Sequence, residues 1–411
     1  MKHRIQKIIG CALLLALSIC GAAGAQAQET ITLTPTLIEE AVCDARALAL
    51  PGEAMLLYGQ QPSETPPHTD AYAVAVDGAG QRLWSLRIGE AQADNRFSAA
   101  WMLPDGRILL KLSNRDGTWG TQYYLVSAAG AVQGMLPADH IRGDAIDTGV
   151  HETLQPVPGG YLGGGVSFID GAFDRMRDAV DIAHFDEALG LRWRITSDAF
   201  LGANLPIARA AADGFLLAGS QTVVIDPVKG TVAGHPYAVK LDQAGEIVWQ
   251  YHGHDWAVAA IGDLWPTADG GALFTTNRDP SLPAPAPAVN AATLSKLDAS
   301  GQLAWMRQYL QSDGYAGFGS LVPYGAGYLL VGYPEGETLP SILHVSATGD
   351  VLGQFELALP PHEFPDLTLI PLADGGVLLS GNVVNYGTPN EWGSREMASS
   401  TPYYLRIDEP Q

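Results

Sequence analysis

A strand-like segment that ends in Asp or Ser recurs seven times along this 411-residue chain. Successive ends lie 48 to 62 residues apart. A repeat of this length holds about four short strands, and no single copy can bury its apolar face alone. The closing residues are Asp77, Ser127, Asp186, Asp242, Asp298, Ser346 and Asp408.

Two turn signals frame each copy. A Gly-rich or Asp-Gly turn precedes it and is followed by an apolar run, as at 215–219 and 328–332. A second turn, with Gly expected in the left-handed conformation, follows six of the seven copies. An aromatic residue then opens the next strand at Trp84, Trp193, Trp249 and Trp305. Each repeat therefore predicts four antiparallel strands, a to d, with tight a–b and c–d turns and longer b–c and d–a links.

The seventh repeat has no room for a strand d, because the chain ends three residues after Asp408. The segment 31–34 alternates and is β-prone, and it has no other evident partner. Pairing it as the outer strand of the last repeat would close a ring and protect the sheet edges. The sequence thus predicts an all-β fold: a seven-bladed β-propeller of four-stranded antiparallel blades, with the last blade closed by the N-terminal strand.

The first 27 residues have the pattern of a secretory signal peptide. Basic residues precede the apolar run 8–19, and Ala25-Gln26-Ala27 suits signal peptidase. We expect a mature chain of 28–411 that forms one propeller domain and is secreted or extracytoplasmic, in the periplasm or at the bacterial cell surface. Lipoprotein anchoring through Cys20 is the less favoured alternative, since Ile19 is bulky where such sites carry small residues.

Charge and cysteine content limit the binding partners and the disulfides that this chain can have. The net charge of −21 becomes −24 once the three basic residues of the leader are removed, which disfavours nucleic acid. Cys43 is the only cysteine after the leader, so no internal disulfide is possible. No later segment is long and apolar enough to cross a bilayer, and we expect a monomer.

The c–d unit at 240–249, echoed at 296–305 and 75–84, resembles the quinoprotein-like repeat of bacterial propellers. Members of that superfamily that bind pyrroloquinoline quinone place it beside an adjacent-cysteine disulfide and a calcium site. This chain lacks such a cysteine pair. The resemblance therefore implies the fold, and it implies no cofactor, metal or catalytic residue here.

Repeated polar positions have a structural explanation. The closing Asp residues suit turn capping. The position two before them holds His184, Lys240, Lys296, His344 and Arg406 in five blades, so a histidine there is one polar choice among several. We expect neither His184 nor His344 to be a metal ligand.

The irregular segments predict the binding face instead. The b–c and d–a links emerge on one face, and the least regular are 61–70, 222–236, 280–287 and 383–402. The candidate ligand-binding residues on this face are Trp119, His252, His254, Asp255, Trp256 and Trp392. Two imidazoles and a carboxylate at 252–255 are zinc-ligand types, but spacing identifies no further ligand, so we predict a polar binding loop without metal.

The favoured function is a non-catalytic scaffold that binds a protein or a glycan through the b–c and d–a face. The alternative is a propeller enzyme, either a quinoprotein-like dehydrogenase or a glycan hydrolase or lyase. Its residues would project into the central channel, for example Glu152, Asp263 and Asp366. The fold alone does not distinguish a binding scaffold from an enzyme, because propellers host both classes.

Overall fold

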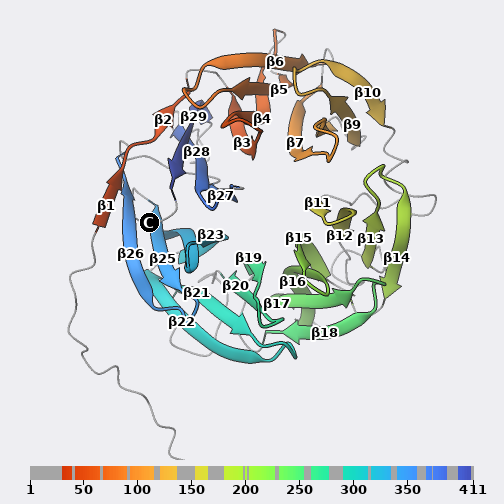
Figure 1. The fold of residues 1–411 in the computed structure, drawn as a ribbon, viewed down its shortest axis with the longest axis vertical. Helices are drawn as coiled ribbons and strands as arrows, with labels where there is room; N and C mark the ends of the chain where they lie inside the picture. The colour runs from red at the N-terminus through yellow and green to blue at the C-terminus, as the bar shows by residue number, and fades with distance from the viewer. Residues whose placement is uncertain are drawn as a thin grey trace, which may run out of the picture.

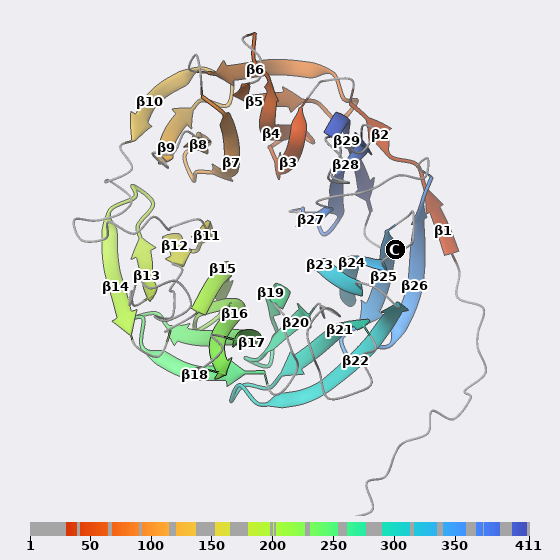
Figure 2. The same ribbon diagram turned by 180° about the vertical axis from the view of Figure 1, so that it is seen from behind.

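The computed structural model shows an all-β ring of seven sheets, each with four antiparallel strands, and one of the sheets has a fifth, parallel strand at its outer edge (Figures 1 and 2). It confirms the predicted seven-bladed propeller. In each blade the chain starts at the strand nearest the centre of the ring and proceeds outward. Blade seven differs in that the N-terminal segment supplies its outermost strand. The residues that the structure describes are 30–38, 42–64, 68–89, 93–114, 121–136, 153–164, 180–197, 200, 203–226, 231–253, 261–276, 290–312, 316–334, 340–358, 367–372, 374–386 and 397–408.

The blades follow one another around the ring in chain order. Blade one comprises β3 (Cys43–Ala49), β4 (Met55–Pro62), β5 (Thr69–Val76) and β6 (Arg82–Ile88). Blade two comprises β7 (Asn95–Met102), β8 (Ile108–Asn114), β9 (Thr121–Val126) and β10 (Val132–Leu136). Blade three comprises β11 (Thr153–Val157), β12 (Gly160–Gly164), β13 (Val180–Phe185) and β14 (Leu191–Ser197). Blade four comprises β15 (Ala203–Ala211), β16 (Gly214–Asp226), β17 (Thr231–Asp242) and β18 (Ile247–His252).

The remaining blades include the two N-terminal strands. Blade five comprises β19 (Ile261–Pro266), β20 (Ala272–Thr276), β21 (Asn290–Leu297) and β22 (Leu303–Ser312). Blade six comprises β23 (Ala316–Tyr324), β24 (Gly327–Pro334), β25 (Ser341–Ser346) and β26 (Val351–Leu357), with β1 (Thr30–Leu33) added outside β26. Blade seven comprises β27 (Thr368–Pro371), β28 (Val377–Tyr386), β29 (Met397–Ile407) and β2 (Thr36–Leu37).

Ring closure differs from the prediction in one detail. The N-terminus does complete blade seven, but through β2, which pairs antiparallel with β29. The segment 31–34 was wrongly expected there. Most of it lies in β1, which pairs parallel with β26 of blade six. The backbone reaches both edges because only Thr34 and Pro35 separate the two strands.

The c–d turns confirm the capping role of the closing residues. In blade four, Asp242 Oδ1 accepts the backbone N–H of Ala244 (2.8 Å) and of Glu246 (2.9 Å). Blade three departs from the glycine rule, because Leu189 and not Gly190 has a positive φ, of 66°. The turn hydrogen bond fixes that position three residues after Asp186, as in blade four, but the sequence places Leu189 there and Gly190 one residue later. Burial of the Leu189 side chain offsets the unfavourable backbone conformation.

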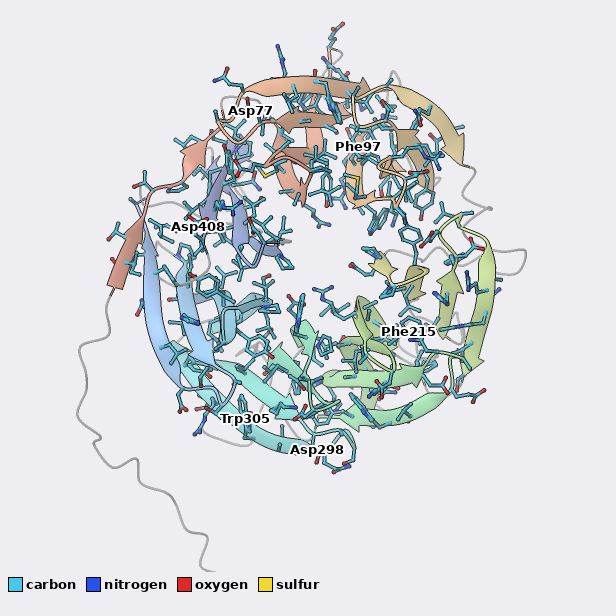
Figure 3. The ribbon with its side chains drawn as sticks, viewed as in Figure 1. Asp77, Phe97, Phe215, Asp298, Trp305 and Asp408 are labelled. Carbon is cyan, nitrogen blue, oxygen red and sulfur yellow. The ribbon has the colours of Figure 1, made fainter. Side chains whose placement is uncertain are left out.

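The core is divided among the interfaces between blades. Within the described residues, one apolar cluster lies at each of the seven interfaces. Phe97 packs with side chains of blade one, and Phe215 packs with side chains of blade three (Figure 3). Each blade thus buries its apolar surface against its two neighbours, and closure of the ring completes this burial for blades one and seven.

Tryptophans at the start of strand d join successive blades. Trp84, Trp193, Trp249 and Trp305 each lie against the c–d turn glycine of the next blade, where a Cβ would come within 2.5 to 3.1 Å of the ring. Those glycines also have φ between 80° and 89°. Glycine is required at these turns for both reasons, and this explains the recurring pairing of Gly and Trp in the sequence.

Candidate functional site

One of the six predicted ligand-binding residues lies in the described part of the chain. Trp119, His254, Asp255, Trp256 and Trp392 lie outside the described residues, so their grouping on one face stays a prediction. His252 ends β18 on the b–c side of blade four, and its side chain is exposed.

The His252 side chain contacts a glutamine and a tyrosine on the neighbouring strands. Its Nδ1 lies 2.9 Å from Oε1 of Gln221 on β16. Its ring lies 5.0 Å, centroid to centroid, from the ring of Tyr237 on β17. The Tyr237 hydroxyl accepts a hydrogen bond from Nε2 of Gln250 (3.0 Å). Three strands therefore bring two aromatic rings and two amides together at one edge, which we call the blade-four edge.

A second histidine near this edge, His235, has a ring nitrogen without a described hydrogen-bond partner. His235 pairs with Gln221 in the β16–β17 ladder. Its buried Nδ1 has no hydrogen-bond partner among the residues that the structure describes. Sequence analysis missed Gln221, Tyr237 and His235, because the repeat places them at ordinary strand positions and only the fold brings them beside His252.

Three of the links expected to be irregular lie partly in strands, and the first is 61–70, whose ends belong to β4 and β5. In blade four, β16 and β17 stay paired as far as Asp226 and Thr231, beyond the last described partners on β15 and β18. In blade seven, β28 and β29 stay paired as far as Tyr386 and Met397. The predictions for 222–236 and 383–402 were wrong to this extent, because Gly and Pro there suggested loops while the β-branched residues extend the hairpins. Both hairpins lengthen the b–c face.

The basic residues on strand c are structural. Lys240 is buried, and its Nζ lies 2.8 Å from an oxygen of Asp213 in the a–b turn and 3.1 Å from the carbonyl oxygen of Gly270 in the next blade. Lys296 forms the same kind of pair with Asp269, at 2.8 Å. Lys296 hydrogen bonds, together with those from Thr267 and Gly271, lower the pKa of Asp269 to about 2 against the opposing effect of burial.

His184 and His344 pack against aromatic side chains, and for His344 this side chain is Tyr324, with the ring centroids 5.0 Å apart. His184 lies between Trp193, 5.3 Å away, and Phe215, 5.1 Å away, measured between ring centroids. Burial lowers the pKa of both histidines. Neither nitrogen of His184 has a hydrogen-bond partner among the described residues. The aromatic neighbours of His184 among the described residues, Trp193 and Phe215, pack on its ring and supply no metal ligand.

Of the three acids suggested for a channel-based enzyme, Glu152 and Asp366 lie outside the described residues. Asp263 on β19 is buried, and its Oδ1 accepts hydrogen bonds from Nη2 of Arg209 (2.8 Å) and from the backbone N–H of Leu264 (2.8 Å). Its Oδ2 accepts the backbone N–H of Leu321 in blade six (2.9 Å). Burial raises the pKa of Asp263, and Arg209 opposes this shift. Asp263 therefore joins blades four, five and six, and both its oxygens are engaged.

A pocket of about 380 Å³ lies on the opposite side of the ring, between blades one and seven. It is lined by the a–b turn of blade one together with Leu372, Asp374, Leu378, Tyr404 and Arg406 of blade seven. Sequence analysis did not find it, since its two walls are more than 300 residues apart in the chain.

Two features are absent from the described residues. No helix there is long and apolar enough to cross a membrane. Nor does that part of the chain contain a group of three His, Cys, Asp or Glu side chains placed to hold a metal ion.

Comparison with known proteins assigns this chain to no family. No family model and no curated protein matches the sequence. Among solved structures, the WD40 domain of Toxoplasma gondii coronin is 11% identical, covering 93% of this chain and 88% of that one, with a TM-score of 0.49. The β-propeller domain of the Pyrococcus furiosus Trilobed protease is 10% identical, covering 89% and 96%, with a TM-score of 0.46. A europium-containing methanol dehydrogenase is 11% identical, covering 89% of each chain, with a TM-score of 0.40.

Proposed function

We propose that this chain is an exported, non-catalytic propeller that binds a protein or a glycan through its b–c and d–a face. The observation that carries the proposal is the blade-four edge, where the exposed ring of His252 and the half-buried amide of Gln221 lie beside a lengthened hairpin, with the buried ring of Tyr237 packed against the imidazole. Aromatic rings with polar neighbours suit sugars and peptide segments. The kinship with the quinoprotein-like superfamily is part of this proposal and extends to the scaffold alone.

Export is tested on the full chain expressed in a bacterial host, followed by cell fractionation and intact-mass measurement. Processing by signal peptidase gives an extracytoplasmic protein whose first residue is Gln28. A mass that begins with acylated Cys20 would instead identify a lipoprotein. An unprocessed cytoplasmic chain would refute export.

Binding is tested by thermal unfolding of the purified chain with a panel of bacterial cell-wall and host oligosaccharides. A ligand present at about a hundred times its dissociation constant adds about 2.7 kcal/mol to the free energy of unfolding. The shift should shrink in Gln221→Ala and His252→Ala and persist in Gln81→Ala, an exposed substitution on the c–d turn side. If no sugar shifts the midpoint, the same three variants are compared for capture of protein from envelope extracts. Equal behaviour of all three in both assays would refute this edge as the binding site.

A further inference from the structure

The seam pocket, as we name the pocket between blades one and seven, combines apolar walls with a charged rim. Leu50, Met55, Leu372, Leu378 and Tyr404 contribute to the walls. Its volume of about 380 Å³ lies within the range of roughly 300 to 1,000 Å³ that is usual for small-ligand sites. The pocket can therefore take an apolar side chain together with a short polar extension.

Negative charge predominates at the rim. Arg406 donates from Nε to Asp408 (2.7 Å) and from Nη2 to Asp374, while its Nη1 lies 3.9 Å from an oxygen of Glu53. The hydrogen bond from Arg406 lowers the pKa of Asp374, so this carboxylate is ionised at neutral pH. Of the charged residues that line the pocket, Glu53 and Asp374 are acidic and Arg406 is basic, so an excess of one negative charge remains, in a chain whose net charge is already −21. A cation is the ligand that such a field attracts.

Glu53 occupies a position that its side chain does not favour. It has φ of 62°, directly after Gly52 with φ of 73°, and such a two-residue turn prefers Gly, Asn or Asp. Among the described residues, Leu189 is the one other non-glycine with positive φ, and it gains burial in return. The Glu53 side chain is exposed, so packing does not compensate it. A non-glycine residue in this strained conformation, at a position that lines the pocket, points to a role for its carboxylate at the rim.

We propose that the seam pocket binds a peptide segment in which a basic residue is adjacent to an apolar one. The apolar side chain enters between Met55, Leu378 and Tyr404, and the basic group meets Glu53 and Asp374 at the rim. This site lies on the a–b and c–d turn side, and it is independent of the blade-four edge.

The test is calorimetric titration of the purified chain with three blocked dipeptides: acetyl-Leu-Lys-amide, acetyl-Leu-Gln-amide and acetyl-Leu-Glu-amide. The lysine peptide should bind tightest and the glutamate peptide weakest, with the difference decreasing as salt is raised. Equal affinity for all three, or no saturable binding of the lysine peptide, would overturn the proposal.

Variants locate the binding. Glu53→Gly should lower the affinity for the lysine peptide about threefold, the size usual for one exposed charge pair, without lowering the thermal midpoint. Asp105→Asn removes the same charge from the exposed a–b turn of blade two and should leave the affinity unchanged. Ala49→Phe should fill the pocket and abolish binding, with its thermal midpoint measured alongside. Wild-type affinity in Glu53→Gly, or an equal loss in Asp105→Asn, would refute the assignment.

Discussion

At the residue scale, in the five blades where the strand c position two before the closing residue is basic or a histidine, the choice between the two follows the chemistry of the blade's own a–b turn. Lys240, Lys296 and Arg406 occur in blades whose a–b turn carries an Asp that they contact. His184 and His344 occur in blades whose a–b turn, at 158–160 or 325–327, has none. Polarity at this position therefore has a local cause, and the expectation that these histidines serve structure rather than metal binding rests on the same pattern.

The enclosure of His184 predicts acid sensitivity. Burial, assisted by the Arg192 charge and opposed by Asp186, places the pKa of His184 below the ordinary 6.5 in the folded state. The unfolded chain therefore takes up the proton first, and the free energy of unfolding falls as the pH drops below 6.5. His184→Phe should show a smaller loss between pH 7.5 and 5 in urea unfolding. Identical pH dependence in the variant would show that His184 titrates alike in both states.

Removal of a single turn-capping oxygen should lower the free energy of unfolding modestly. Asp242→Ala removes the acceptor of two backbone N–H groups and should lower the free energy of unfolding by about 1 kcal/mol. Asp242→Asn keeps one oxygen at the same place and serves as the matched control, with a smaller loss expected. Urea unfolding of both variants measures the difference. An equal loss would mean that the charge, and not the hydrogen bonds, stabilises the turn.

At the element scale, the repeat predicted the strands within each blade correctly, but it did not identify the partner of a strand that adds to an open sheet edge. Turn glycines and closing residues define each blade within about 50 residues, so strand order and blade number were predictable. A four-residue alternating segment such as 31–34 fits any unpaired strand edge, so its partner was not. The candidate binding residues fall in irregular links, where the repeat gives no register. His252 was predicted, whereas Gln221 and Tyr237 became neighbours of it only through the pairing of β16, β17 and β18.

The two N-terminal strands should contribute unequally to stability. A chain that begins at Pro35 loses β1 alone and exposes one edge of blade six. A chain that begins at Glu39 also loses β2 and the buried side chain of Ile38, which packs against Tyr404 and Leu378 at the seam. The second truncation should cost at least about 2 kcal/mol more than the first, as expected for a large buried aliphatic side chain. Urea unfolding of both chains measures this, and equal losses would place ring closure elsewhere.

At the scale of the whole molecule, the ring depends on contacts that cross blade boundaries. The apolar clusters lie at the interfaces, and turn glycines receive tryptophans from the preceding blade. Trp305, labelled near Asp298 in Figure 3, is the last of the four. Polar groups also connect blades. The Asp263 carboxylate accepts hydrogen bonds from three successive blades. Its position near the start of a central strand is that expected of a channel residue, but its bonds are those of a structural link.

Asp263 therefore predicts a coupled pair. Asp263→Leu should lower the free energy of unfolding by about 3 kcal/mol, because it leaves Arg209 and the Leu321 N–H without their acceptor. Arg209→Met should also destabilise, since it leaves a buried carboxylate without its counter-charge. The double variant replaces the pair by apolar side chains and should lose less than the sum of the two single losses. Additive losses in the urea-unfolding cycle would show that the two groups act independently, and Asp263 would then need another explanation for its burial.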